Sequence, residues 1–311
     1  MGALAWATDA GGRLTLFGGG GHLKGLGGGR WLRYRQGMSQ LQSISRLWLL
    51  GCGNMGGALL EGWRKGGLAD TAITVIDPAL PQLGGGVRVL SSLPAEPLPD
   101  IFVSAIKPQV AAQILAPLSA QMTPQCLLLS IMAGIDCATL ARMSGATAIV
   151  RAMPNTPARI GKGVSGLIAQ GATDTQKAQA EALMASVGMA LWLETEAQFD
   201  ALTALSGSGP AYLFHFIEAL AAAGVQQGLS TELAAELARQ TVFGAAALAE
   251  TSGRDAGDLR REVTSPNGTT AAGLAQLDGP QHQLTALLFQ TLEAAAARSR
   301  VMAEEARAQA G

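Results

Sequence analysis

A hydroxyl-rich turn in the second half of the chain carries the side chains best suited to bind a small anion. Residues 263–273 read VTSPNGTTAAG, which places four hydroxyls just before a helix-like run. Asn267 and Gly268 among them tolerate backbone conformations that other residues avoid. The start of a helix presents unpaired N–H groups and a partial positive charge, so this turn suits a carboxylate. An ordinary helix cap fits the same residues, and the turn alone leaves both interpretations open.

A glycine-rich loop much earlier in the chain indicates a dinucleotide. The segment LWLLGCGNMGGALLEGW has an apolar run, then Gly51, Gly53 and Gly56, then a helical pattern. Strand, G-x-G-x-x-G and helix in this order bring a pyrophosphate close to a helix N-terminus. A second apolar run, 73–76, ends at Asp77, 21 residues after Gly56. Since an acid at this place holds the ribose hydroxyls, the pattern predicts a dinucleotide site.

The motifs, taken in order, resemble the pyrroline-5-carboxylate reductase family from Arg46 to about Ala303. This family makes proline. One departure is Asn267, where the family commonly has Gly; because Asn tolerates positive φ, we expect the turn to survive. A second is Ser92, where many relatives have Asn. The matching segments are GCGNMGGALLEG, SAIKPQ at 104–109, SIMAGI at 130–135, RAMPNTP at 151–157, LSGSGPAYLFHFIEAL at 205–220, QTVFGAA from Gln240, and VTSPNGTTAAGL.

The expected fold is α/β, with an N-terminal Rossmann-like dinucleotide-binding domain at 46–198 followed by an all-α dimerisation and substrate domain at 199–311. In the first, β-type runs alternate with helical ones, which indicates a parallel sheet with crossover helices. In the second, alanine-rich helices carry apolar residues on more than one face, which is typical of a domain that packs on its own copy. The predicted strands are 46–50, 73–77, 87–90, 101–105, 127–130, 147–150, 164–168 and 189–193, and the predicted helices of the second domain are 199–205, 209–227, 230–252, 256–263, 269–277 and 280–307.

Residues 1–45 differ from the rest, and we predict a glycine-rich disordered extension there. Glycine-rich chain without hydrophobic periodicity cannot offset its ordering entropy. It also lacks the apolar stretch of a secretory signal. We expect residues 1–37 to contribute nothing to folding or activity, with Met38 as the initiator.

Composition excludes several classes of protein. A formal net charge of -1 with no basic block offers nothing to grip nucleic acid. No apolar run reaches the ~18 residues needed to cross a bilayer, so no membrane association is expected. The three cysteines and three histidines show no metal-ligand spacing, and so few cysteines fit a reducing cytoplasm. We therefore expect a cytoplasmic protein without a metal.

The family resemblance implies the residues of the site. It places the substrate carboxylate at the hydroxyl-rich turn and Thr270 near the ring nitrogen. Lys107 directly follows a predicted strand, and its position alone fits a ligand and a solvated loop residue equally well. The implied cofactor-binding residues are Gly51, Cys52, Gly53, Asn54, Met55, Gly56, Asp77, Ser92, Ala105, Ile106, Lys107, Pro108, Ile131, Met132 and Ala133, and the implied substrate residues are Ser265, Gly268, Thr269 and Thr270.

The implied reaction is the reduction of 1-pyrroline-5-carboxylate to L-proline by hydride transfer from NADPH or NADH. An imine near neutral pH is already partly protonated, so positioning can replace a strong acid. Thr270 lacks a useful pKa near 7, which makes it an orienting and proton-relay group. Family members often prefer NADPH, whereas the Asp77 carboxylate repels a 2′-phosphate and favours NADH.

Two alternatives stay open at this stage. One is another dehydrogenase with a Rossmann-like and a helical domain, acting on a hydroxy acid or a different imine; no Lys or His base stands out in the helical half. The other is a non-catalytic NAD(P)-binding scaffold, which would not need the intact SPNGTT and SGSGP segments. For the reductase, the family implies a homodimer whose pocket uses both subunits, with further assembly of dimers to a decamer.

Overall fold

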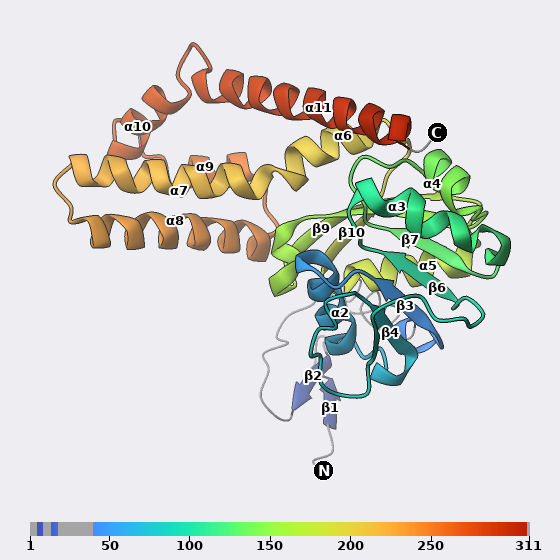
Figure 1. Ribbon diagram of the computed structural model, residues 1–311. Coiled ribbons are helices and arrows are strands. Elements are labelled where there is room, and N and C mark those ends of the chain that lie inside the picture. The colour runs from blue at the N-terminus through green and yellow to red at the C-terminus, as the bar shows by residue number, and fades with distance from the viewer. Residues whose placement is uncertain (1–4, 9–13, 18–39, 310–311) are drawn as a thin grey trace.

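An eight-stranded sheet forms the centre of the N-terminal domain (Figure 1). The computed structural model describes residues 5–8, 14–17 and 40–309. The strand order is β10-β9-β8-β7-β6-β3-β4-β5. All eight strands predicted from the sequence are confirmed. They are β3 (Leu47–Leu50), β4 (Ile73–Ile76), β5 (Arg88–Leu90), β6 (Ile101–Ser104), β7 (Leu127–Ser130), β8 (Ile149–Pro154), β9 (Gly163–Gln170) and β10 (Gly188–Trp192).

Helices cover both faces of this sheet, which explains why its central strands are continuous apolar runs. Along β3, Leu47 and Leu49 face one hydrophobic cluster while Trp48 and Leu50 face the other. The first cluster lies under α2 (Asn54–Lys65) and α5 (Asp174–Ala185), and the second under α3 (Pro108–Leu115) and α4 (Cys137–Ser144).

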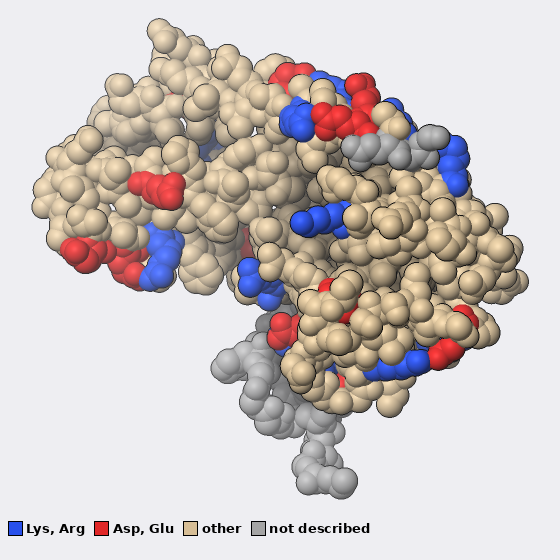
Figure 2. All heavy atoms as spheres, viewed as in Figure 1, with Lys and Arg blue, Asp and Glu red and all other residues tan. Residues whose placement is uncertain are grey.

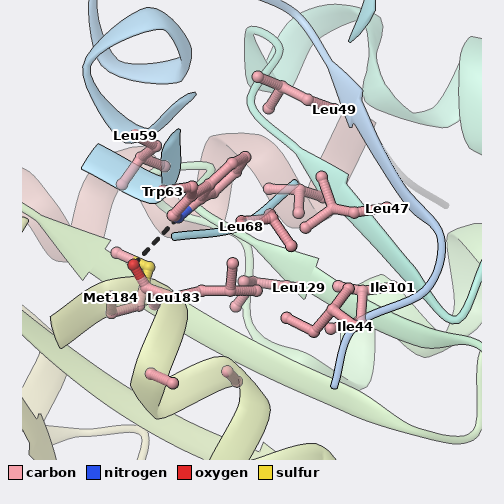
Figure 3. Close-up of a cluster of buried hydrophobic side chains, with 14 of the residues drawn as sticks. Ile44, Leu47, Leu49, Leu59, Trp63, Leu68, Ile101, Leu129, Leu183 and Met184 are labelled. Atoms are coloured by element: carbon pink, nitrogen blue, oxygen red, sulfur yellow. Dashed lines mark hydrogen bonds between the residues drawn. The ribbon is translucent and has the colours of Figure 1, made fainter. Parts of the chain in front are cut away.

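A single hydrogen bond joins the two helices of the first face. The indole nitrogen of Trp63, on α2, donates to the carbonyl of Leu183, on α5, over 3.0 Å (Figure 3). Both side chains are fully buried. Because the indole N–H is satisfied, this large ring fills the core without leaving an unpaired polar group.

The prediction of a parallel sheet is wrong at one edge. β8 pairs with β9 in antiparallel register, with Ala152 opposite Leu167. The connection between them contains only the short 3₁₀ helix Thr156–Ile160. A parallel connection needs a crossover of a dozen residues or more, so this short link forces β9 to reverse direction. β10 then runs parallel to β9.

The second domain is an arm of helices that extends away from the sheet (Figure 1). α7 and α8 lie side by side along it, and α11 returns so that its C-terminal end reaches the first domain. The predicted helices are confirmed, with a π-helical segment, Thr203–Gly207, joining the first two. The helices are α6 (Gln198–Leu202), α7 (Gly209–Gln226), α8 (Thr231–Ser252), α9 (Ala256–Glu262), α10 (Thr269–Leu277) and α11 (Gln283–Gln309).

The arm exposes apolar side chains that a folded interior would normally hide. Phe214, Phe243 and Phe289 are 62%, 69% and 73% exposed. No residue of α7, α9 or α10 is buried in the structure. Figure 2 shows that most of the visible face of the arm carries neither acidic nor basic side chains. An apolar surface of this extent marks a protein interface. None of the described helices is long and apolar enough to cross a membrane.

The predicted disordered extension needs correction in two places. β1 (Ala5–Thr8) and β2 (Leu14–Phe17) form an antiparallel pair. Leu41 and Ile44 are 2% and 3% exposed and belong to the first hydrophobic cluster, so packing begins before residue 46. The rest of the predicted extension up to residue 39 lies outside the described residues.

Candidate active site

Four loops meet at the carboxyl edge of the sheet, where strands β7, β6, β3 and β4 end. Hydrogen bonds fix their order: the Gly51 amide donates to the Ile76 carbonyl over 2.9 Å, and the Ala105 amide donates to Leu50 over 2.8 Å. The Ile131 amide donates to the Ser104 carbonyl over 3.0 Å. The structure thereby brings together the predicted cofactor segments 51–56, 105–108 and 131–133, with Asp77 beside them.

Each glycine of the G-x-G-x-x-G loop answers a different steric demand. Gly51 has a φ of +88°, and a Cβ there would stand 2.8 Å from the carbonyl oxygen of Ala105. A Cβ on Gly56 would stand 2.2 Å from the Gly51 oxygen. A Cβ on Gly53 would meet nothing within 4 Å. Two glycines therefore permit close packing, whereas Gly53 borders open space in front of α2.

This open space fits a pyrophosphate. Gly53 is the N-cap of α2 and offers no side-chain oxygen to the first amides of the helix. Gly53 and Asn54 are exposed, while Cys52 and Met55 are half-buried. Unpaired amides at a helix start favour an anion, so the loop suits the pyrophosphate of NAD(P)H.

Asp77 lies against the same loop. One carboxylate oxygen accepts the Cys52 amide over 2.7 Å, and the other accepts the Ala79 amide over 2.8 Å. Burial and then the charge of Asp77 raise the pKa of the Cys52 thiol. A negative charge is thus held at the end of β4 by two backbone donors, the place expected for the ribose-binding acid.

Two buried serines orient the loop after β7. The Met132 amide donates to the Ser130 hydroxyl over 3.3 Å, and the Ser104 hydroxyl donates to the Met132 sulfur over 3.5 Å. Met132 is only 2% exposed, whereas Ile131 and Ala133 are half-buried. Met132 therefore anchors the loop from inside while its neighbours border the crevice.

The remaining cofactor residues lie at the same edge of the sheet. Lys107 is the exposed N-cap residue of α3, and Pro108 is the first residue of that helix. Ile106 is half-buried beside Gly51. Ser92 is exposed two residues after β5, whose Leu90 carbonyl accepts the Asp77 amide.

The predicted substrate turn has the expected backbone. Asn267 adopts a φ of +58°, a conformation that asparagine tolerates better than most other non-glycine residues, and the Gly268 amide donates to the Ser265 carbonyl over 3.1 Å. Gly268 is the N-cap of α10, and Thr269 and Thr270 are its first two residues. Both threonines are exposed.

Within one chain the turn does not reach the cofactor loops. In Figure 1, α10 lies in the part of the arm farthest from the sheet. The structure therefore keeps the cofactor half and the substrate half of the predicted site apart. The two halves are separated because the helical arm extends away from the sheet and carries the turn with it.

The structure shows a junction between the two domains that the sequence did not predict. Arg151, at 7% exposure, forms an ion pair with Glu196 and lies 3.8 Å above the ring of Phe199. Asn155 donates from its amide nitrogen to both the carbonyl and the hydroxyl of Ser206, each over 3.1 Å, and accepts the Val164 amide. These contacts tie the end of β8 to the segment that opens the arm.

Comparison with known proteins decides the family. Residues 196–302 match a family model described as pyrroline-5-carboxylate reductase dimerisation. The pyrroline-5-carboxylate reductase of Pseudomonas aeruginosa is 41% identical over 271 residues, which cover 85% of this chain and 98% of that relative. The chain belongs to the pyrroline-5-carboxylate reductase family.

Solved reductase structures agree with this assignment. The pyrroline-5-carboxylate reductase of Coxiella burnetii superposes with a TM-score of 0.77 at 33% identity, over 84% of this chain and 99% of that one. The enzyme of Plasmodium falciparum, solved with NADP bound, gives a TM-score of 0.69 at 30% identity, over 84% and 99% of the two chains. The Rossmann-like domain and the helical domain are both included in this similarity.

Proposed function

We propose that this protein is an NAD(P)H-dependent pyrroline-5-carboxylate reductase that reduces 1-pyrroline-5-carboxylate to L-proline, the last step of proline biosynthesis. The observation that carries the proposal is the 41% identity to the Pseudomonas reductase over nearly the whole of that enzyme. The glycine loop with its open space at Gly53 supplies independent support for the cofactor.

The cofactor is held by the loops at the carboxyl edge of the sheet. The amides around Gly53 at the start of α2 would hold its pyrophosphate, and Asp77 and Ser92 would contact its adenosine ribose. The segments Ala105–Pro108 and Ile131–Ala133 form the opposite wall. When bound, NAD(P)H supplies the hydride to the imine carbon, and the protein contributes its position relative to the substrate.

The substrate is held by the turn before α10. Its carboxylate accepts hydrogen bonds from the free amides at the start of that helix and from the hydroxyls of Ser265 and Thr269. Thr270 lies on the side of the ring nitrogen, where it orients the imine and relays a proton from water. No strong acid is required, since the iminium form accepts the hydride.

The complete site requires a second copy of the chain. The protein is a homo-oligomer built on its dimerisation domain, and the exposed apolar face of the arm supplies the contact surface. We place the turn of one subunit opposite the cofactor loops of its partner, and we expect dimers to assemble further to a decamer. The thiols of Cys52, Cys126 and Cys137 are free, which supports a cytoplasmic location.

The test is an assay of the purified full-length protein. Oxidation of NADH and NADPH is followed at 340 nm with 1-pyrroline-5-carboxylate, and the product is identified as L-proline by chromatography. Small 2-hydroxy acids with NAD⁺ and an imine without a carboxylate serve as comparison substrates. Turnover of the hydroxy acid alone would indicate a different dehydrogenase, and cofactor binding without any turnover would indicate the scaffold.

A further inference from the structure

The C-terminal turns of α11 lie against the loop that follows β7. Gly134 in this loop has a φ of +76°, and a Cβ there would stand 3.4 Å from the Met302 carbonyl oxygen and 3.6 Å from the Cα of Ala303. One turn later, Ala306 is 8% exposed and belongs to the same hydrophobic cluster as Met132 and Ile135. The end of α11 therefore contacts the loop after β7, and both contribute side chains to the same hydrophobic cluster.

An ion pair fixes the same helix to the end of this loop. The Nε atom of Arg307 lies 3.1 Å from Oδ2 of Asp136. The other oxygen of Asp136 accepts the Thr139 amide over 2.7 Å and so caps α4. Residues 131–136 are thus held between β7 and a capped helix, with α11 joined to them at Gly134 and at Asp136.

The segment that links the two domains forms a hydrogen bond with Cys137, the residue after Asp136. The Cys137 amide donates to Glu196 over 2.8 Å, and the other carboxylate oxygen of Glu196 pairs with Arg151. The loop that lines the cofactor crevice is therefore bounded on its far side by α11 of the helical domain and by the segment around Glu196 that leads into that domain. Both elements thus contact residues 134–137, which directly follow the Ile131–Ala133 segment.

We propose that the C-terminal turns of α11 set the position of the Ile131–Ala133 loop and thereby the affinity for NAD(P)H, with Arg307 as a positioning residue that acts through Asp136. This inference rests on the proposed function only in taking that loop as a wall of the cofactor site. Arg307 lies beyond residues 196–302, the segment matched by the family model, and 171 residues from Asp136 along the chain.

A matched pair of variants tests it. Arg307→Gln removes the ion pair between Arg307 and Asp136, which we call the clamp. Arg300→Gln is the control, because Arg300 pairs with Glu293 inside α11 and its side chain is 49% exposed, compared with 51% for Arg307. Dissociation constants of NADH and NADPH are measured by fluorescence titration on the full-length oligomer without imine. Melting temperature, KM for the imine and kcat are measured beside them.

We expect Arg307→Gln to raise the cofactor dissociation constant about 3- to 10-fold, in line with a partly exposed ion pair that positions a loop. Melting temperature should stay within about 2 °C of wild type, and Arg300→Gln should match wild type throughout. Arg307→Lys should recover part of the affinity. Asp136→Asn keeps a capping side chain and should reproduce the loss, with no further loss in the double variant.

The outcomes separate this inference from the proposed function. Equal cofactor affinity in folded Arg307→Gln and Arg300→Gln overturns the clamp, and so does a fall in melting temperature with unchanged affinity. Failure of the wild type to reduce 1-pyrroline-5-carboxylate would overturn the proposed function instead, while a cofactor affinity that still depends on Arg307 would leave the clamp standing.

Discussion

Thr270 is the residue on which the proposed chemistry depends most directly. Thr270→Val keeps the β-branched shape and removes the hydroxyl, so folding and cofactor binding should persist. We expect kcat/KM for the imine to fall about 10- to 100-fold, since positioning groups of this kind are worth roughly that much. Steady-state kinetics and a cofactor titration check this. An unchanged kcat/KM would reduce the turn to a helix cap.

Asp77 is the residue expected to select between NADH and NADPH. Its carboxylate is held beside the phosphate loop by the amides of Cys52 and Ala79. Replacing it with Ser removes a repulsion of order 1–2 kcal/mol toward a 2′-phosphate. The ratio of kcat/KM for NADPH to that for NADH should rise about 5- to 30-fold. Asp77→Asn is the control for charge alone, and a ratio that stays constant in both variants would assign selection elsewhere.

Two buried thiols give the protein a sensitivity to alkaline pH. Burial, followed by the charge of Asp100, raises the pKa of Cys126 to about 12, and burial with Glu196 does the same for Cys137. A raised folded-state pKa means that the stability contribution is complete below the ordinary value of 9.0 and is lost as pH rises toward about 12.

We expect the wild type and a variant without these thiols to differ in how steeply the free energy of unfolding changes with pH. Between pH 9 and about 12, the free energy of unfolding of the wild type should fall more steeply than that of Cys126→Ala/Cys137→Ala, by up to about 1.4 kcal/mol per pH unit for each thiol. Denaturant titrations at successive pH values measure both slopes. Parallel curves would show that burial does not raise the pKa of either thiol in the folded protein.

Residue patterns revealed the glycine loop and Asp77, because each belongs to a short motif with its own steric or electrostatic demand. They did not reveal the partners of Arg151 and Arg307, whose carboxylates lie 45 and 171 residues away. An arginine at the end of a strand gives the same sequence pattern whether its side chain contacts a ligand or a carboxylate of the protein. Only the packing of the arm on the first domain decides which it is.

At the scale of elements, the turn before α10 depends on Asn267. Its φ of +58° is costly for most residues and free of cost for glycine. Asn267→Gly should therefore change stability by less than about 0.5 kcal/mol and preserve KM. Asn267→Ala should destabilise by roughly 1 kcal/mol and raise KM for the imine. Thermal melts and kinetics of both variants measure this; equal behaviour of the two would show that the turn adapts.

The strands were predictable because central strands buried on both faces are unbroken apolar runs. Their direction was less so. β8 and β9 match parallel strands in composition, and the reversal follows from the short link at Thr156–Ile160, whose turn chemistry the sequence does not announce. The π-helical segment Thr203–Gly207 was likewise unforeseen, since Asn155 stabilises it from another domain.

For the whole molecule, the beginning of the fold can be located by truncation. A chain that starts at Met38 should match the full-length protein in melting temperature and turnover. A chain that starts at Arg46 loses Leu41 and Ile44, which are both buried, and should lose about 3–6 kcal/mol of stability. Denaturant unfolding of the three chains checks this. A deficit already present in the Met38 chain would give residues 1–37 a role.

The arm has a kinetic consequence. None of the residues of α7, α9 and α10 is buried, so these helices gain little from tertiary packing until another chain covers them, and helices depend on such packing. After dilution from denaturant, the sheet domain should regain its structure at a rate independent of protein concentration. Recovery of the arm and of enzyme activity should then follow second-order kinetics, with a half-time that shortens as the chains become more concentrated.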